Sequence, residues 1–257
     1  PPRSTLFPYT TLFRSKHVPS LEGQIRAAVR NNVVGTDVVA RVSCETDCEK
    51  FVLISTDKAV NPTSIMGATK RMAEILVQAQ NARSEVAFIT VRFGNVLGSA
   101  GSVVPLFKRQ IAEGGPVTVT HPDVTRFFMT ISEACQLIMQ ACVQGKGSET
   151  FVLGMGEPIK ISYLAKQLMR MAGLIPGQDI EIVYTGLREG EKLVEELFHN
   201  EEKLEKTLHD QISLAESRAL NSDSVVNAVR LLTSNIQQSD TDGIEQFIKE
   251  LVPEYRQ

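Results

Sequence analysis

Short apolar runs alternate along the middle of the chain with longer segments in which apolar residues recur at helical spacing. The apolar runs are continuous, which is typical of strands buried on both faces of a parallel sheet. This alternation predicts an α/β fold with a doubly wound parallel sheet. The strands are expected at residues 51–55, 86–91, 117–120 and 151–153, and the helices after Pro62 and at residues 103–112 and 132–144.

The pattern extends in both directions from this middle part. Residues 20–40 carry apolar positions at helical spacing, which predicts a single helix with Ser20 as its N-cap after Pro19. No repeat or low-complexity linker follows, so we expect a second, smaller α/β domain interleaved with the first. Beyond residue 156 the pattern predicts a helix at 161–172, a strand at 180–184, a charged stretch at 186–196 and a polar tail from Glu201 with helical apolar spacing.

The composition is that of an ordinary globular protein. Of the 257 residues, 42% are hydrophobic and 22% are charged, with a formal net charge of −3. This balance excludes disordered and collagen-like chains and gives no electrostatic reason to expect nucleic acid as a partner. No apolar run is long enough to cross a bilayer, so no membrane contact is expected from this chain itself. The cysteines lack the spacing of a zinc site, and we expect no metal; they are Cys44, Cys48, Cys135 and Cys142.

Residues 1–15 follow neither a helical nor a strand period and contain no acidic residue. They also lack the apolar core and the cleavage site of a signal peptide. Written as codons, the segment resembles a short-read sequencing adapter, so we expect it to be non-native. A natural leader rich in Pro, Thr and Phe is the alternative. The native sequence is then expected to begin in mid-gene at Lys16.

The residues with the most informative chemistry follow the first predicted strand. At the carboxyl end of a buried parallel strand, Thr56, Asp57 and Lys58 would project into the crevice where α/β sheets bind ligands. Met66 and Lys70 stand four apart on the next helix, so they share one face and can point into the same crevice. An acid and two amines would then converge. A strand-end turn with a solvated Asp/Lys pair is the structural alternative.

Several motifs follow one another along the chain, beginning with Ser55-Thr-Asp-Lys-Ala59, a helix with Lys70, and Val91-Arg-Phe-Gly-Asn95. In this order they resemble the extended short-chain dehydrogenases/reductases, and most closely the UDP-N-acetylglucosamine 4,6-dehydratases of polysaccharide biosynthesis. The resemblance runs from Lys16 to the C-terminus. The other motifs are Lys16-His-Val-Pro19, Asn31-Asn-Val-Val-Gly-Thr36, Gly101-Ser-Val-Val-Pro-Leu-Phe107, Thr125-Arg-Phe-Phe-Met-Thr130, Gly186-Leu-Arg-Glu-Gly-Glu-Lys192 and Leu251-Val-Pro-Glu-Tyr255.

The resemblance implies a partial Rossmann-like sheet. Its first strands and its glycine-rich NAD-binding turn would precede Lys16, because no suitable glycine pattern occurs in the chain. Residues 16–156 would then form the remainder of the NAD-binding domain with the catalytic residues. Residues 157–257 would form mainly the nucleotide-sugar domain. The first predicted strand would lose its neighbour and become an exposed apolar edge.

Met66 departs from the superfamily pattern, which places a tyrosine four residues before the lysine. None of the four tyrosines of this chain has a lysine four residues later. A thioether cannot act as a general base, so an ordinary dehydrogenase with this change would be inactive. Larger, membrane-anchored members of the dehydratase branch resemble this sequence in having methionine there, which makes Met66 a subfamily marker. What deprotonates the C4 hydroxyl stays open.

The resemblance also implies catalytic roles. Lys58 would be the base at C5 of the sugar and Asp57 the acid at the C6 hydroxyl, while Thr56 would hydrogen-bond the C4 oxygen. Lys58 would have to be partly neutral and Asp57 protonated when they act, which predicts a desolvated site. The cofactor would be NAD rather than NADP. Lys70 would hold the nicotinamide ribose, and Lys16 and Ser55 would also contact the cofactor.

The substrate implied by the resemblance is a UDP-sugar. Arg126 and Arg188 lie in the segments that resemble the diphosphate-binding positions, where arginine is the favoured bidentate partner. Glu191 would accept from the ribose hydroxyls, and Asn95 would meet the phosphates or the sugar. The full-length parent is expected to be a cytoplasmic homo-oligomer, with an anchor in the inner membrane as a further option.

Two other functions stay open at this point. A nucleotide-sugar epimerase or reductase of the same superfamily would need the missing tyrosine, which argues against it. A non-catalytic fragment that only binds nucleotide sugars is the second alternative, because the NAD-binding turn would lie outside the chain. We therefore expect the 257-residue chain itself to be inactive and poorly soluble, and dehydration to belong to its full-length parent.

Overall fold

A five-stranded sheet is the centre of the computed structural model, which describes residues 18–99, 101–199, 202–216, 221–236 and 238–256. The parallel strands β1 (Lys50–Ile54), β2 (Ala87–Arg92) and β7 (Thr150–Leu153) continue into the antiparallel strands β11 (Ile212–Ala215) and β10 (Leu204–Lys206). Strands β1 and β2 align Phe51 with Phe88, whose ring centroids lie 5.1 Å apart. The α/β fold predicted from the sequence is confirmed, with a mixed sheet in place of a purely parallel one.

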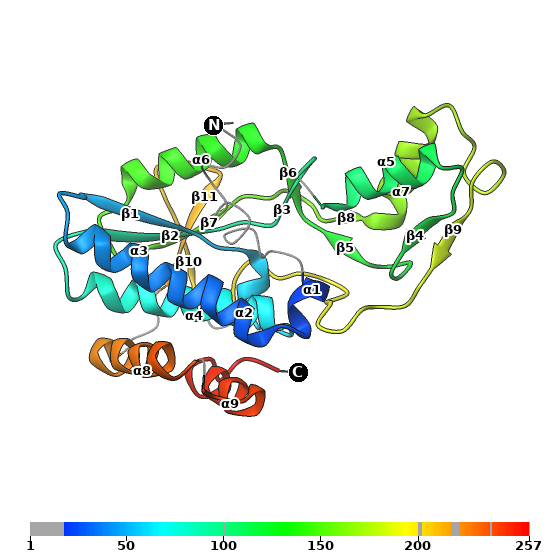
Figure 1. Cartoon of the computed structure of the whole chain (residues 1–257). Coiled ribbons are helices and arrows are strands. Elements are labelled where there is room, and N and C mark those ends of the chain that lie inside the picture. The colour runs from blue at the N-terminus through cyan, green and yellow to red at the C-terminus, as the bar shows by residue number, and fades with distance from the viewer. Residues whose placement is uncertain (1–17, 100, 200–201, 217–220, 237, 257) are drawn as a thin grey trace, which may run out of the picture.

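Helices cover both faces of this sheet (Figure 1). Helix α6 (Ile131–Gln144) lies on one face, and α3 (Gly35–Cys44) and α4 (Ile65–Asn81) lie on the other. Two late helices, α8 (Ser222–Asn235) and α9 (Thr241–Leu251), pack against the outer side of α4. Helix α4 is therefore enclosed between layers, and its residues Met72 and Leu76 are fully buried.

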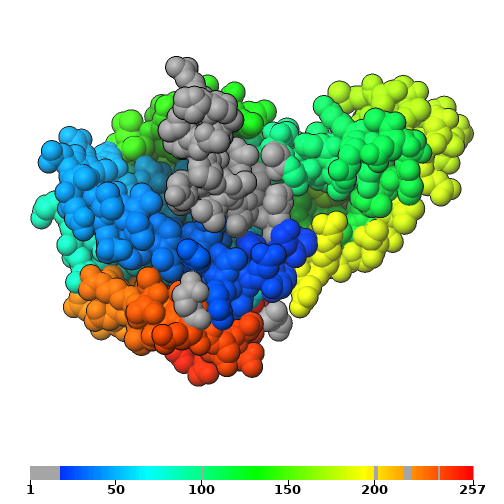
Figure 2. Space-filling model, viewed as in Figure 1, coloured from blue at the N-terminus to red at the C-terminus, as the bar shows by residue number. Residues whose placement is uncertain are grey.

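A smaller lobe stands out to one side of the sheet and has its own apolar core around Phe107 (Figures 1 and 2). It contains α5 (Val103–Ala112), α7 (Ile161–Met171) and the parallel strands β4 (Val117–Val119) and β9 (Ile182–Tyr184). Two short pairs lie between this lobe and the sheet. They are β3 (Asn95–Val96) with β6 (Phe128–Met129), and β5 (Thr125–Arg126) with β8 (Ile159–Lys160).

The chain passes between the two lobes more than once. Helices α5 and α7 belong to the smaller lobe, whereas α6 and β7, which lie between them in sequence, belong to the larger one. Strands β10 and β11 and helices α8 and α9 also belong to the larger lobe. The boundary placed at residue 156 stays a prediction, and residues 1–15 lie outside the described part of the chain.

Most elements of the middle part occur where the hydrophobic pattern predicts them, but two sheet assignments were wrong. The strand expected at 117–120 is β4, which pairs with β9 in the smaller lobe and not with the main sheet. The polar tail expected to be helical begins with β10 and β11. Strand β10 is exposed along its length, so its side chains carry no signal of burial that a sequence pattern could reveal.

The single helix predicted at 20–40 was also wrong. The structure has α1 (Val18–Glu22), then α2 (Ile25–Val29), a π-helical turn η3 (Arg30–Val34) and α3. Ser20 lies within α1 and is not an N-cap. The helix is interrupted before α2 because the backbone of Gln24 has φ −134° and ψ 46°, which is not helical.

Strand β1 lies at the edge of the described sheet, with β2 as its strand neighbour. One face is well covered, because Leu53 packs with Ala40 of α3 and Val77 of α4. Ile54, however, is 41% exposed. The expectation of a strand buried on both faces was therefore wrong for β1 in the described structure, and an exposed apolar edge position is present.

Lys50 ties β1 to the end of α6. Its ammonium donates to the carbonyl oxygens of Cys142, Val143 and Gly145, at 2.8, 3.3 and 2.9 Å. These carbonyls belong to the last turn of α6, where a cation is favourable. We expect Lys50→Met to lower the free energy of unfolding by about 1–2 kcal/mol in urea titrations. The exposed Lys146, just beyond the same helix end, is the control, and an equal effect of Lys146→Met would contradict this role of Lys50.

Candidate active site

The end of β1 leads into a 3-10 turn, η4 (Asp57–Ala59), which presents the predicted catalytic residues. The hydroxyl of Thr56 caps this turn by accepting from the backbone N–H of Lys58 at 3.4 Å. The turn rests on the start of α4, where a Cβ atom at position 67 would collide with the carbonyl oxygen of Lys58. Gly67 permits this close approach, and its N–H donates to the Ser64 hydroxyl that caps α4, at 3.1 Å.

Lys58 is the centre of a charged cluster. Its ammonium lies 3.0 Å from Oδ1 of Asp57 and 3.2 Å from Oε1 of Glu195. Asp57 is fully buried and also accepts from the Thr56 hydroxyl at 2.8 Å. Its other oxygen, Oδ2, is buried without a hydrogen-bond partner among the described residues. Asp57 and Lys58 therefore form a pair inside the site, and the alternative of a solvated strand-end turn is excluded.

The carboxylates hold a proton on Lys58. Burial by itself lowers the pKa of this lysine, but the charges of Asp57 and Glu195 outweigh burial and raise the pKa above its ordinary value of 10.5. Arg126 acts in the opposite direction. In the structure the two are an ion pair, and Glu195 is a second carboxylate beside Lys58 that the sequence analysis did not anticipate. A partly neutral Lys58 beside a protonated Asp57 during the reaction stays a prediction.

A cavity of about 620 Å³ opens beside this cluster, between the carboxyl ends of β1 and β2 and the smaller lobe. The smaller lobe contributes Val103 and Phe107 of α5 and Thr120, which follows β4. Open α/β sheets bind ligands in this position. The predicted site residues that line the cavity are Ser55, Thr56, Lys58, Met66, Lys70, Asn95, Arg126, Arg188 and Glu191.

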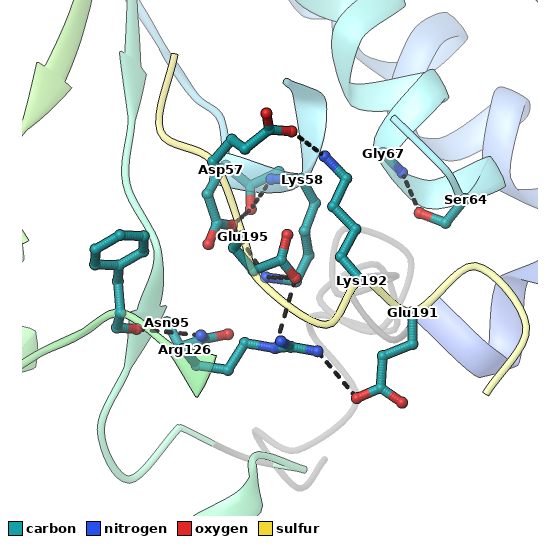
Figure 3. A network of polar contacts seen from close by, with 12 residues as sticks. Asp57, Lys58, Ser64, Gly67, Asn95, Arg126, Glu191, Lys192 and Glu195 are labelled. Carbon is teal, nitrogen blue, oxygen red and sulfur yellow. Dashed lines mark hydrogen bonds and ion pairs between the residues drawn. The ribbon is translucent and has the colours of Figure 1, made fainter. Parts of the chain in front are cut away.

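Arg126 lies between two carboxylates of the loop that returns from the smaller lobe (Figure 3). Its guanidinium contacts Oε1 of Glu191 at 3.0 Å and Oε1 of Glu195 at 3.5 Å. Glu191 is further held by the Thr120 hydroxyl at 3.0 Å and by the backbone N–H of Arg188 at 3.2 Å. Arg126 was predicted to bind the diphosphate and Glu191 the ribose. In the structure these two residues are paired with each other.

Met66 and Lys70 line the cavity from one face of α4, as their spacing predicts. Met66 is buried, and the ammonium of Lys70 donates to the carbonyl of Ile54 at 2.6 Å. Burial lowers the pKa of Lys70, and the charge of Glu74 opposes this effect. An ammonium has three donors, so Lys70 retains donors for a hydroxyl-bearing ligand in the cavity.

Ser55 lines the cavity, but its hydroxyl donates a hydrogen bond to the buried carboxylate of Glu74. Glu74 also accepts from Arg92 at 2.9 and 2.7 Å and from Arg71 at 3.0 Å. Arg92 is fully buried. In the structure, Ser55 therefore belongs to a buried ionic network beneath the site, and its contact with a cofactor stays a prediction.

The other predicted ligand-binding residues differ in how they are held. Asn95 uses its side-chain N–H to donate to the carbonyl of Phe127 at 3.1 Å, which fixes its orientation at the cavity wall. Arg188 is exposed, and no hydrogen bond or ion pair joins its guanidinium to another residue of the described part. Lys16 lies outside the described residues.

Sequence reasoning missed several polar residues of this site, and two of them contact predicted residues. Glu195 contacts both Lys58 and Arg126, and Thr120 orients Glu191. Glu195 stands four residues after Glu191 in the charged stretch that the sequence analysis identified, so its place in that stretch was the available signal. Its contacts with β5 and η4 depend on the path of the loop, which no local pattern specifies.

Other classes of site were also considered. Among the residues that the structure describes, no group of three or more His, Cys, Asp or Glu side chains is arranged to hold a metal ion. Within the same residues, every helix is too short or too polar to cross a lipid bilayer.

Comparison with known proteins gives a consistent family assignment. Residues 13–217 match the model of a family described as "Polysaccharide biosynthesis protein". The chain is 54% identical over 77% of its length to the capsular polysaccharide biosynthesis protein CapD of Staphylococcus aureus, of which it covers 33%. It is also 54% identical over 73% of its length to the probable polysaccharide biosynthesis protein EpsC of Bacillus subtilis, of which it covers 31%. The chain thus spans about a third of the length of these relatives.

More distant relatives include proteins whose names specify an epimerisation reaction. The chain is 35% identical over 73% of its length to a protein of Rickettsia canadensis named UDP-glucose 4-epimerase, of which it covers 54%. Among solved structures, Pen from Bacillus thuringiensis is 33% identical, with a TM-score of 0.71 over 88% of this chain and 74% of that one. The dTDP-glucose 4,6-dehydratase DesIV of Streptomyces venezuelae, solved with NAD, shares the fold at 17% identity, with a TM-score of 0.64 over 85% of this chain and 70% of that one.

Proposed function

The chain belongs to the polysaccharide biosynthesis protein family of the extended short-chain dehydrogenases/reductases, and we propose that it carries the acid–base and substrate residues of a UDP-N-acetylhexosamine 4,6-dehydratase. The substrate would be UDP-N-acetylglucosamine and the product a 4-keto-6-deoxy sugar nucleotide. One observation supports this most strongly. A single cavity is lined both by Thr56 and Lys58 and by Arg126, Arg188 and Glu191, which suits a sugar joined to a diphosphate.

The cavity suits the nicotinamide end of NAD, because Lys70 presents donors to it beside Met66. When bound there, NAD would accept a hydride from C4 of the sugar and return it to C6. Lys70 would hold the ribose hydroxyls. Thr56, whose hydroxyl is 2.8 Å from Asp57, would orient the C4 oxygen.

Water loss requires that protons move between the two charged groups of η4. The ion pair across 3.0 Å gives a short path for the Lys58 proton to pass to Asp57, which leaves a neutral amine and a carboxylic acid. Lys58 would then remove the proton from C5, which the C4 ketone acidifies, and Asp57 would protonate the departing C6 hydroxyl to form water. The C5 proton would return from Lys58 when C6 is reduced. The proton that the C4 hydroxyl releases on oxidation would replace the one that Asp57 gives to water, so the net change is loss of one water.

Diphosphate binding by the arginines can be tested without catalysis, on the protein encoded by the complete gene. We expect UDP to bind in isothermal titration calorimetry, and Arg126→Gln and Arg188→Gln each to weaken it about tenfold or more, because each removes a charge-assisted contact to phosphate. The control is Arg109→Gln, since Arg109 is exposed on α5 and pairs with Glu113. Equal UDP affinity in all of these variants would exclude the proposed diphosphate site.

The reaction itself is tested on the protein encoded by the complete gene, incubated with UDP-N-acetylglucosamine and NAD. We expect mass spectrometry to find a nucleotide sugar lighter by one water. Epimerisation is the second candidate, favoured by the relatives named UDP-glucose 4-epimerase. Recovery of an epimer of unchanged mass would support that candidate and contradict dehydration.

Location and assembly are further proposals. One relative carries the name membrane protein MJ1061, from Methanocaldococcus jannaschii, with 50% identity over 73% of this chain and 58% of that protein. The name supports a parent protein attached to a membrane, and we propose that this part lies on the cytoplasmic side. A homo-oligomeric parent is proposed as well, and size-exclusion chromatography with light scattering would test it.

A further inference from the structure

Glu195 is a buried carboxylate that joins the two halves of the site. It lies on the loop that returns from β9 to the sheet, and only 5% of the residue is exposed. Its Oε1 atom lies 3.2 Å from the ammonium of Lys58 and 3.5 Å from Nε of Arg126 (Figure 3). One oxygen atom thus contacts both the proposed base and the proposed diphosphate-binding arginine.

The other oxygen of Glu195 shows that this residue is not placed for stability alone. Oε2 is buried and has no hydrogen-bond partner among the described residues. A buried carboxylate oxygen without a partner is costly, and a residue selected only for packing would be more favourable with an apolar side chain. Its negative charge, directed at Lys58 and Arg126, is therefore the feature that needs an explanation.

Several charged groups face Lys58 from the elements around it. Asp57 lies in the same turn, Glu195 on the returning loop and Arg126 on β5. Arg188 and Lys192 line a small cavity of about 170 Å³ together with Lys58, and Lys192 is paired with Glu196 at 3.0 Å. Among the residues that the structure describes, Glu195 is therefore the group, besides Asp57, whose negative charge directly contacts the Lys58 ammonium.

We propose that Glu195 is a positioning residue that favours the protonated form of Lys58, and that it couples Lys58 to the anion-binding state of Arg126. The coupling arises because the two cations share one carboxylate oxygen. When an anion draws Arg126 away, the charge of Glu195 acts on Lys58 alone. Glu195 thereby disfavours neutral Lys58, and does so more strongly when an anion engages Arg126.

The role of Lys58 as a base rests on the proposed function, but the test of Glu195 does not depend on that function. Trace acetylation with acetic anhydride labels only the neutral amine, and mass spectrometry of the peptide that contains Lys58 measures the labelling rate across pH in the protein encoded by the complete gene. No sugar nucleotide is needed. If the protein does not dehydrate the sugar nucleotide but Lys58 labels as expected in the variants, only the proposed function is contradicted. If dehydration occurs but the labelling of Lys58 does not depend on Glu195, only the role of Glu195 is contradicted.

We expect Glu195→Gln to raise the labelling rate of Lys58 at pH 8 about tenfold, because loss of the charge lowers the pKa of Lys58 and increases its neutral fraction. The control is Glu196→Gln, since Glu196 pairs with Lys192 and not with Lys58. The control should label like the wild type. Equal labelling of Lys58 in the wild type and Glu195→Gln would overturn the proposal.

A second substitution of Glu195 separates charge from shape. Glutamine keeps the shape of glutamate, whereas Glu195→Asp keeps its charge on a shorter side chain. The labelling rate of Lys58 in Glu195→Asp should therefore be closer to the wild-type rate than the rate in Glu195→Gln is. A purely structural role predicts the reverse order.

The coupling to Arg126 is tested by a separate variant. Arg126→Gln removes a positive charge that opposes protonation of Lys58, so it should slow the labelling of Lys58. Faster labelling in that variant would contradict the coupling, even if Glu195→Gln fails to fold.

Discussion

Lys58→Met, made in the protein encoded by the complete gene, is expected to lower the turnover of UDP-N-acetylglucosamine by about a thousandfold or more. Methionine fills the space of the lysine stem but cannot take a proton from C5. The ion pair with Asp57 and the contact with Glu195 would also be lost, so the proposed base and the proposed acid of the turn η4 are both affected. The measurement is kcat, from the rate at which the dehydrated nucleotide sugar accumulates.

UDP binding separates a chemical defect from a folding defect in this variant. We expect its Kd to stay within a few-fold of the wild type, because Arg126 and Arg188 supply the diphosphate contacts. The matched control is Lys166→Met, on the exposed side of α7. A Lys58→Met protein with substantial dehydratase activity would show that the C5 base lies elsewhere in the site.

Glu74→Gln is expected to cost about 3–5 kcal/mol of unfolding free energy, a large part of the stability of an ordinary domain. The change removes the carboxylate that accepts from Arg92 through two bonds, from Arg71 and from the Ser55 hydroxyl. Arg92 is fully buried, so its charge would lose its closest partner in a medium of low dielectric. Urea titrations give the free energy. The exposed Glu85 provides the control substitution, Glu85→Gln, and equal losses in both variants would contradict the argument.

The same network gives an expected pH dependence. Burial by itself raises the pKa of Glu74, but Arg92, Arg71 and Ser55 outweigh burial and bring the pKa from 4.5 down to about 2. A lowered pKa contributes stability that is complete above the unfolded value and is lost as the pH falls from 4.5 towards 2. The wild type should therefore lose more stability across this range than Glu74→Gln does. Parallel losses in the two proteins would exclude Glu74 as the source.

The elements with a strong apolar period were predicted well. Helix α5 has the predicted bounds, and α6 and α7 differ from the prediction by one residue at one end. The elements that were missed or misjudged lack such a signal. Strand β10 is exposed, and the break between α1 and α2 depends on the backbone of a single residue, Gln24. Which sheet β4 joins depends on its pairing with β9, more than sixty residues later in the chain.

The sequence by itself determined the α/β class and the order of its middle elements. It also determined that Thr56, Asp57 and Lys58 follow a strand and that Met66 and Lys70 share a helix face, because periodicity and spacing are local properties. Only the tertiary structure decided that Ser55 turns to Glu74 and that Glu195 reaches Lys58 and Arg126. The charge state of Lys58 is set by these contacts, because the strength of an electrostatic interaction depends on distance and burial, which the fold of the whole chain determines.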